Sequence, residues 1–259
     1  MIKMVWRNKD EDNIWDKHSH RGESSNFNFR DMNHLVLFKD SELNKLEFGD
    51  KPLIRWIHSI DEEAKRKKKK LVVLDAGCGT GFFALYMAKL GHKSYGLDFS
   101  KESLEIAKKL VDKNKLHVDF RLGDVRKLPY KDKFFDLIIS SGVIEHFPDT
   151  SSALREYDRV LKKDGKFIGN VPNRYSIFVI SKLFLKLIRK WDVGYEKSFS
   201  QNKLKKLLNA SHFRIIRFVR MPIAVGKRCP IYGKILRSIE KPFFSYIGGM
   251  HTYFFTEHT

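Results

Sequence analysis

The chain has 259 residues, 42% of them hydrophobic and 13% aromatic, which is enough for one α/β domain with a sizeable core. The 50 Lys and Arg against 31 Asp and Glu give a net charge of +19, which favours polyanions, anionic membrane surfaces or acidic small molecules as partners. With only Cys78 and Cys229, no disulfide framework is expected, and a reducing, cytoplasmic location fits better.

The first part of the chain, residues 1–66, is expected to form a helical cap before a main domain of residues 67–259. Its start, MIKMVWRNKDED, lacks the apolar core of a signal peptide, so we expect none. LIRWIHSI (53–60) has helical spacing. The basic run KRKKKK (65–70) then precedes the first strand, as a solvated linker or as a contact for RNA or lipid.

From residue 71 onward, apolar runs alternate with segments of helical periodicity. This alternation predicts a parallel, doubly wound sheet, and the nearly continuous apolar runs indicate strands that are buried on both faces. The turn signal DGKF (164–167) marks the entry to the fifth strand. The predicted strands are 71–75, 94–98, 116–122, 135–140 and 165–171, and the predicted helices are 81–90, 101–113 and 150–162.

The C-terminal part continues with a helix in SQNKLKKLLNASHF, for which Ser200 is the expected N-cap. Strands are predicted at 213–220 and 251–258. No run of about 18 apolar residues, as a membrane span needs, occurs in the sequence.

Two amphipathic segments, 175–191 and 231–241, interrupt this pattern. The first is apolar except for a narrow stripe formed by Lys182, Lys186, Arg189 and Lys190. Such wide apolar faces fit helices that pack on the domain as a lid, or helices that cover an apolar substrate or touch a membrane. We therefore expect helical lid insertions at about 174–193 and 221–249.

The stretch LVVLDAGCGTG (71–81) runs from a buried strand into a glycine loop. Glycines in such a loop allow a ligand to approach the main chain, and the amides of the following helix face that ligand. GTGFFA (79–84) also fits the dinucleotide pattern G-x-G-x-x-G/A, which is weak on its own. Asp98 follows at the end of the second strand, where a carboxylate accepts ribose hydroxyls. A ribose-bearing ligand is predicted, with NAD still open.

Other residues at strand ends separate the candidate ligands. Asp75, directly before the glycines, would repel a pyrophosphate and suits a ligand with an ammonium group. Asp124 follows the third strand and suits an adenine amino group. The fourth strand ends in small residues before Glu145 and His146, which leaves space for a second substrate.

Four blocks of sequence resemble the successive motifs of class I S-adenosylmethionine-dependent methyltransferases. The blocks are VVLDAGCGTGFFALYMAKLG, YGLDFS, GDVRKLPYKDKFFDLIISSGVIEHFPD and LKKDGKFIGNVPN. The resemblance covers 71–172, continues more loosely through 194–218, and is strongest to the small-molecule group that includes the ubiquinone and menaquinone biosynthesis methyltransferases. It implies a Rossmann-like seven-stranded sheet whose last strand, 251–258, lies antiparallel beside 213–220.

The same resemblance implies S-adenosylmethionine as the cofactor. Asp75 and the glycine loop would hold its methionine end, while Asp98 would hold the ribose and Phe99 would lie against the adenine. The adenine edge would be contacted by Asp124 and Val125, and the sulfonium side by Ser140 and Ser141. The implied cofactor residues are Asp75, Ala76, Gly77, Cys78, Gly79, Gly81, Asp98, Phe99, Asp124, Val125, Ser140 and Ser141.

Methyl transfer needs a base only if the acceptor loses a proton. His146 is the preferred candidate because an unperturbed imidazole has a pKa near 6.5, and Glu145 beside it is the second catalytic candidate. The alternative interpretations are that both residues shape the loop, or that His146 contacts the cofactor. His18, His20 and His34 are further candidates within the predicted cap. No Cys/His spacing indicates a metal site.

The sequence at the end of the fourth strand narrows the class of methyl acceptor. SSGVIEHF lacks the Asn/Asp-Pro-Pro-aromatic tetrad associated with methylation of exocyclic amino groups of bases, and no cysteine near it serves a cytosine-C5 mechanism. We therefore favour a small-molecule or lipid-like acceptor, with peripheral membrane contact through 175–191 and 231–247. Three rivals stay open: an RNA or protein methyltransferase, an NAD-dependent oxidoreductase, and a non-catalytic cofactor-binding subunit of a complex.

Overall fold

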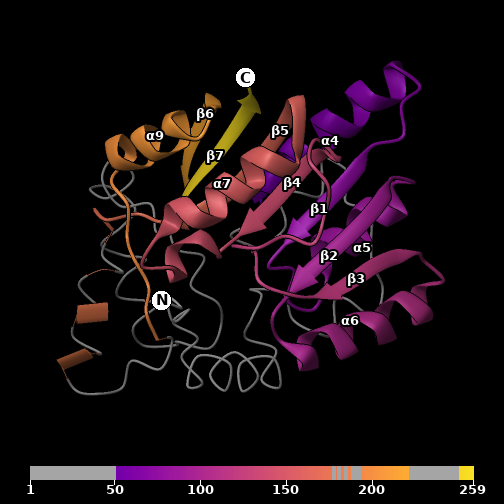
Figure 1. The fold of residues 1–259 in the computed structure, drawn as a ribbon, viewed down its shortest axis with the longest axis horizontal. Coiled ribbons are helices and arrows are strands. Elements are labelled where there is room, and N and C mark those ends of the chain that lie inside the picture. Colours follow the sequence, from indigo (N-terminus) through magenta and orange to yellow (C-terminus); the bar gives the residue numbers. More distant parts are fainter. Residues whose placement is uncertain (1–50, 177–178, 180–181, 184–185, 188–193, 222–250) are drawn as a thin grey trace, which may run out of the picture.

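The computed structural model describes residues 51–176, 179, 182–183, 186–187, 194–221 and 251–259. They form a seven-stranded sheet in the order β3-β2-β1-β4-β5-β7-β6, with helices on both faces (Figure 1). The predicted doubly wound α/β fold is confirmed. Cys229, His18, His20, His34, most of the predicted cap and the segment 231–247 lie outside the described residues.

The strands follow the predicted order along the chain. β1 to β5 pair in parallel, whereas β7 lies between β5 and β6 and is antiparallel to both, as the resemblance implied. Because β1 to β5 are parallel, their carboxyl ends lie at the same edge of the sheet. The strands are β1 (Val72–Ala76), β2 (Lys93–Asp98), β3 (Val118–Leu122), β4 (Phe135–Ser141), β5 (Leu161–Pro172), β6 (Phe213–Met221) and β7 (His251–His258).

Short polar side chains start several of the helices. The Oγ atoms of Ser100 and Ser200 accept hydrogen bonds from the third amide of the helix that follows, which confirms Ser200 as an N-cap. Asp149 caps its helix in a similar way, through the amide of Ser151. The helices are α4 (Lys51–Arg66), α5 (Phe82–Lys89), α6 (Lys101–Asn114), the 3-10 helix η1 (Ile144–His146), α7 (Thr150–Val160) and α9 (Gln201–Ala210).

The boundary between α7 and β5 differs most from its prediction, since β5 begins at Leu161 and not at residue 165. The helix expected over 150–162 ends at Val160, because Leu161 already pairs with Phe135 as the first residue of β5. The predicted turn at 164–167 is an irregularity within β5, where Asp164 takes a φ of +60°. The pairing with β4 resumes at Lys166.

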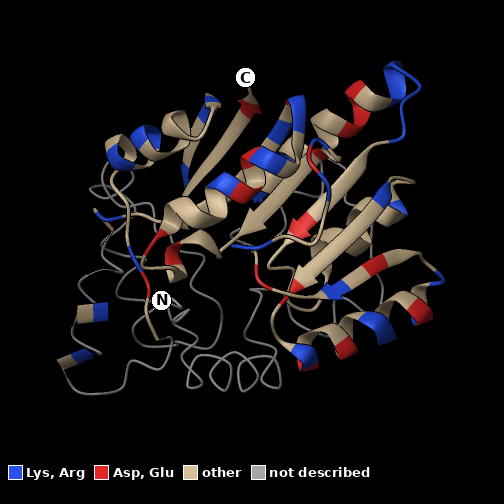
Figure 2. Ribbon diagram, in the orientation of Figure 1, with Lys and Arg blue, Asp and Glu red and all other residues tan. Residues whose placement is uncertain are grey.

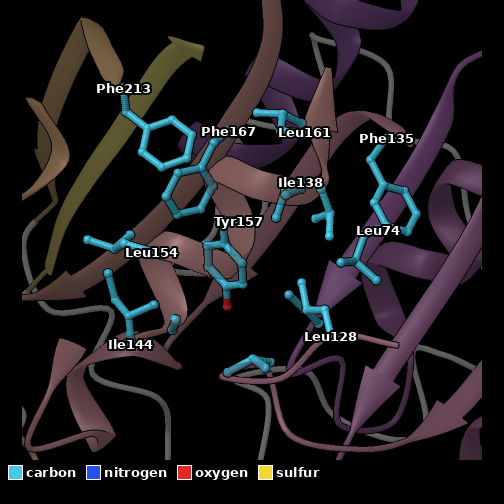
Figure 3. Close-up of a cluster of buried hydrophobic side chains, with 14 of the residues drawn as sticks. Leu74, Leu128, Phe135, Ile138, Ile144, Leu154, Tyr157, Leu161, Phe167 and Phe213 are labelled. Carbon is cyan, nitrogen blue, oxygen red and sulfur yellow. The ribbon is translucent and has the colours of Figure 1, made fainter. Parts of the chain in front are cut away.

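The core has one layer on each face of the sheet. One layer lies beneath α4, α5 and α6, where Trp56 packs 5.7 Å from the ring of Phe255. The predicted helix at 53–60 therefore exists and belongs to this layer. The other layer lies beneath α7 and α9, where Leu154, Tyr157 and Phe167 point toward one another (Figure 3). Burial of each large apolar side chain contributes about 1.5–3 kcal/mol.

Charge is unevenly distributed over the ribbon. Figure 2 shows Lys and Arg gathered at the end of α4 and in the turn that follows it. Within this basic run, Lys69 lies 2.7 Å from Asp136, a buried carboxylate at the start of β4. At least one of these lysines therefore has a role in the fold. No helix within the described ranges is long and apolar enough to cross a membrane.

The predicted basic stripe of segment 175–191 is wrong at Lys182. This side chain is buried and pairs with Glu196, whereas Lys186 is exposed. Arg189 and Lys190 lie outside the described residues. The outward-facing side chains at this part of the segment include Leu183 and Leu187, which are 62% and 80% exposed.

Candidate functional site

A cavity that is open to solvent lies at the carboxyl ends of the parallel strands. This is the edge where open α/β sheets bind ligands. Of the predicted site residues, those that line the cavity are Gly77, Gly79, Asp98, Phe99, Val125, Ser141 and His146. Those that do not are Asp75, Ala76, Cys78, Gly81, Asp124, Ser140 and Glu145.

The glycine loop follows β1 and is held close to β2 and β4. The amides of Gly77 and Cys78 donate to the carbonyl of Leu97 at 2.8 and 3.0 Å. Gly77 has a φ of +73°, and a Cβ built there would lie 2.5 Å from Val143 Cγ2. Glycine is therefore required at this position by both conformation and space.

Asp98, at the end of β2, holds the glycine loop through one carboxylate oxygen and the start of α6 through the other. Oδ2 accepts from the amide of Gly79 at 2.7 Å, and Oδ1 accepts from the amide of Ser100 at 2.9 Å. Each carboxylate oxygen has two lone pairs, so the same group can also accept hydroxyl donors of a ligand. Asp98 therefore joins the glycine loop to the cavity wall.

Asp75 is 2% exposed and lies outside the cavity lining. Its Oδ2 accepts from the amide of Ala84 at 3.0 Å, in the first turn of α5. A carboxylate at a helix N-terminus is favourable because of the unpaired amides there. The described contact of Asp75 thus supports the helix that follows the glycine loop, and its predicted contact with a methionine end stays a prediction.

The other buried members of the loop are structural neighbours of the cavity. Ala76 is fully buried, and Gly81 starts α5 with a φ of +83°, where a Cβ would lie 2.8 Å from the ring of Phe120. Burial, together with the charges of Asp75 and Asp98, raises the pKa of the Cys78 thiol well above its usual range. Cys78 is therefore a neutral packing residue and not a nucleophile.

Asp124 and Val125 were both expected to contact the adenine, but only Val125 lines the cavity. The Asp124 carboxylate accepts from the Arg126 main-chain amide at 2.8 Å and from its Nη2 at 2.6 Å. The Arg126 guanidinium also lies 4.8 Å from the centroid of the Phe147 ring. Val125, between the two, lines the cavity. Sequence reasoning missed the Arg126 partner, and also the lining residues Ser100, Ser103, Gly123, Gly142 and Val143.

The two serines at the end of β4 face different surroundings. Ser140 is buried and its Oγ lies 3.1 Å from the hydroxyl of Tyr157. Ser141 lines the cavity, and its Oγ accepts from the side-chain amide of Asn170 at 3.0 Å. Only Ser141 is therefore positioned to face a ligand.

His146 is the candidate base and lies in the cavity wall. Its Nδ1 lies 2.9 Å from the carbonyl oxygen of Tyr195. Because a carbonyl only accepts, Nδ1 carries the proton and Nε2 is the basic nitrogen. Burial lowers the pKa of His146 to about 4, so the ring is neutral at pH 7.

Glu145 lies beside His146 but is turned into the protein. It is 2% exposed, and its Oε2 has no hydrogen-bond partner in the part of the chain that the structure describes. Burial, with a smaller contribution from Glu196, raises the pKa of Glu145 to about 8, although Lys182 opposes this shift. The carboxyl is thus mostly neutral at pH 7. Among the described residues, no group of three His, Cys, Asp or Glu is arranged to hold a metal ion.

Residues 194–199, at the start of the stretch with the looser resemblance, lie against η1. Besides the Tyr195 carbonyl at His146, the amide of Lys197 donates to the carbonyl of Glu145 at 2.9 Å. Lys182 Nζ donates to the Glu196 carbonyl at 2.5 Å and to its Oε1 at 2.8 Å. These contacts join three distant parts of the chain at the end of the cavity that contains His146.

Residues 74–169 match a family model described as a methyltransferase domain. A ubiquinone biosynthesis O-methyltransferase of Pelagibacter ubique is 32% identical over 148 residues, which are 57% of this chain and 55% of that protein. A demethylmenaquinone methyltransferase of Alkalihalophilus pseudofirmus is 33% identical over 133 residues, 50% of this chain and 56% of that protein. The chain thus spans a little over half the length of these curated relatives.

The fold is shared with a crystal structure of magnesium protoporphyrin IX methyltransferase from Synechocystis PCC 6803, which was solved with bound SAH. The TM-score is 0.58 at 16% identity, over 79% of this chain and 83% of that chain. At this identity, the likeness concerns the fold.

Proposed function

We propose that this chain, which carries a class I S-adenosylmethionine-dependent methyltransferase domain, transfers a methyl group to a hydroxyl of a small aromatic or lipid-like acceptor. The observation that carries the proposal is that a single cavity is lined by the glycine loop and Asp98, with a neutral His146 in the same wall. The glycine loop and Asp98 suit the cofactor, and His146 suits an acceptor that loses a proton.

The residues present fit S-adenosylmethionine. Gly77 and Gly79 bring bare main chain to the cavity, Asp98 offers lone pairs for ribose hydroxyls, and Val125 borders the end expected for the adenine. When bound, the cofactor supplies a methyl group on a sulfonium that is already activated. The chain itself then has to align the acceptor, and alignment of this kind can lower a barrier by about 7–11 kcal/mol.

His146 is proposed to take the proton of the acceptor hydroxyl at Nε2. Its position at the cavity wall supports this role, and at pH 7 the ring is in the unprotonated form that a base needs. The pKa of about 4 makes it a weaker base than the ordinary imidazole expected from the sequence. The similarity to a ubiquinone biosynthesis O-methyltransferase and to a demethylmenaquinone methyltransferase supports a quinone-like aromatic acceptor. An acceptor with a lipid tail would be reached at a membrane surface, for which the exposed Leu183 and Leu187 are the described candidates.

The cofactor is tested by calorimetric titration of the whole chain with S-adenosylhomocysteine and, separately, with NADH. Asp98→Asn keeps one acceptor oxygen and removes the charge, so its affinity for S-adenosylhomocysteine should fall by about 1–3 kcal/mol. Asp119→Asn is the matched control, because this acid lies on the neighbouring strand and pairs with Arg121 at the surface. Binding of NADH without S-adenosylhomocysteine would overturn the proposal in favour of an oxidoreductase.

The acceptor is tested next, with labelled S-adenosylmethionine and separate extracts of quinone-like lipids and RNA. Label in a phenolic lipid supports the proposal. Label in RNA, with binding that weakens steeply as salt rises, would replace it with an RNA methyltransferase.

A further inference from the structure

We infer that Lys182 is a positioning residue for His146, acting through Glu196 and the carbonyl group of Tyr195. The inference rests on the proposed function, because it gives His146 the role of the base. It gives Lys182 a role in the chemistry of the site, in addition to the lid or membrane-contact role expected for segment 175–191.

The first link is the buried ion pair of Lys182 with Glu196. The two side chains are 8% and 9% exposed. Lys182 Nζ donates both to the Glu196 carboxylate, at 2.8 Å, and to the Glu196 main-chain carbonyl, at 2.5 Å. One ammonium group therefore holds the side chain and the main chain of the same residue. Charge-assisted bonds of this kind are short and strong.

The second link is the main chain between Tyr195 and Lys197. The carbonyl of Tyr195 shares a planar peptide unit with the nitrogen and Cα of Glu196, so holding residue 196 orients that carbonyl. On the other side of Glu196, the Lys197 amide donates to the carbonyl of Glu145 at 2.9 Å. Three consecutive residues are thus held against η1 and Lys182.

The third link is the imidazole of His146. A neutral imidazole carries one proton, and the nitrogen without it is the base. The Tyr195 carbonyl, 2.9 Å from Nδ1, keeps the proton on that nitrogen and leaves Nε2 to act as the base. If the carbonyl moves, both tautomers become populated and the ring loses its fixed orientation.

The charges around η1 agree with this arrangement. Among the described residues, Glu196 and Lys182 are the charged side chains that shift the pKa of Glu145, and Lys182 is the one that shifts the pKa of His146. Lys182 pairs with Glu196, and the buried Glu145 stays mostly neutral at pH 7. Removal of the cation alone would leave a buried carboxylate without a partner, which can unfold a protein. The test therefore needs a variant in which both charges are removed.

The experiment compares Lys182→Met, the double variant Lys182→Met/Glu196→Gln, and the control Lys186→Met, which removes an exposed lysine one turn further along. Long-range proton–nitrogen NMR spectra of the ¹⁵N-histidine-labelled whole chain report the His146 tautomer, with His146→Gln used only to assign the signal. Values of kcat and KM are measured with the acceptor found above, and S-adenosylhomocysteine affinity is measured by calorimetry.

We expect the wild type and Lys186→Met to hold a proton on Nδ1 only. The folded Lys182 variants should show a mixture of tautomers and a kcat about tenfold or more lower, with S-adenosylhomocysteine affinity unchanged, because a general base contributes about 10²–10⁴-fold. If Lys182→Met fails to fold, the double variant decides alone.

The inference is overturned if the folded double variant keeps Nδ1 protonated, or if its kcat equals that of the wild type. It is also overturned if Lys186→Met gives the same losses. Because the tautomer is read without turnover, a chain that binds no S-adenosylhomocysteine but responds to Lys182 in the NMR spectrum would refute the proposed function and leave the positioning role standing.

Discussion

The main chain of Gly77 lies so close to Val143 that a Cβ built on the glycine would be 2.5 Å from Cγ2 of the valine. This contact joins the loop after β1 to the loop after β4, and both loops line the cavity. The part of the cavity expected to hold the cofactor and the part expected to hold the acceptor are thus in direct contact at this pair.

Gly77→Ala should weaken S-adenosylhomocysteine binding at least tenfold, because the new methyl group must displace Val143 and the residue keeps a φ of +73°. The strained backbone alone costs about 1–3 kcal/mol. Gly91→Ala is the matched control, because Gly91 has a φ of +92° and a Cβ there meets nothing within 4 Å in the described structure. Affinity from calorimetry and stability from thermal unfolding are compared for the two variants. Gly91→Ala shows the effect of backbone strain alone, and the additional loss in Gly77→Ala comes from the contact with Val143.

A second variant tests the contact itself. Gly77→Ala/Val143→Ala removes the methyl groups that the new Cβ would meet, so it should recover a large part of the lost affinity. If the double variant binds no better than Gly77→Ala, backbone strain and not Val143 explains the requirement for glycine.

The activity of the wild type should be insensitive to pH from about 5 to 7. Burial lowers the pKa of His146 to about 4, so the base is deprotonated through this range, whereas an ordinary imidazole would lose activity below about 6.5. The measurement is kcat/KM against pH. An acid limb near pH 6.5 would show that His146 is not the base, or that it is solvated in the working enzyme.

His146→Gln should lower kcat by about 10²–10⁴-fold and leave S-adenosylhomocysteine affinity within about twofold. His212→Gln is the control, since His212 pairs with Asp158 on the surface, away from the cavity. Equal kcat in the wild type and His146→Gln would exclude His146 as a base and favour a loop-shaping role.

Glu145 should make the stability of the protein fall as pH rises. Burial raises its pKa from 4.5 to about 8, so between these values the folded chain keeps a proton that the unfolded chain releases. Stability then decreases with pH, by at most about 1.4 kcal/mol per pH unit, and levels off above pH 8. Urea unfolding of the wild type and Glu145→Gln from pH 4 to 9 gives the difference between their free energies of unfolding at each pH.

Other groups that titrate in this range, including His146, cancel in the comparison of these two proteins. Glu145→Gln should be increasingly more stable than the wild type from pH 4.5 to 8. A stability difference that is flat across this interval would mean that Glu145 is charged in the folded protein.

The regular part of the fold was predictable because its signals are local. Strands buried on both faces are continuous apolar runs, and α6 and α7 bury residues at helical spacing. Asp98 could be placed at the cavity for the same reason, since it ends a strand beside a glycine loop. The end of α7 was not predictable from periodicity, because Val160 and Leu161 suit a helix as well as a strand and only pairing with β4 decides between them.

The part of the site near His146 was not predictable, because its contacts join distant residues. Lys182 follows the spacing of a basic surface stripe, and nothing near it in sequence indicates a buried partner at Glu196. Likewise, the looser resemblance over 194–218 gives Tyr195 no role, and its carbonyl lies beside a histidine 49 positions away. Asp124 is different, because its partner Arg126 is only two residues further along the chain. A turn with a local ion pair could therefore have been predicted from the sequence as an alternative to an adenine contact.

Binding to membranes is expected to depend on Leu183 and Leu187, which are exposed one turn apart with Lys186 between them. We expect the whole chain to float with vesicles that contain anionic lipid at low salt, since each nearby Lys or Arg contributes about 1 kcal/mol. Leu183→Ser/Leu187→Ser should reduce this binding several-fold, and high salt should release the rest. Ile216→Ser is the control, because Ile216 is 49% exposed on the edge strand β6. Equal flotation of the control and the double variant would assign the binding to charge alone, and no flotation at low salt would rule out contact with the membrane through this segment.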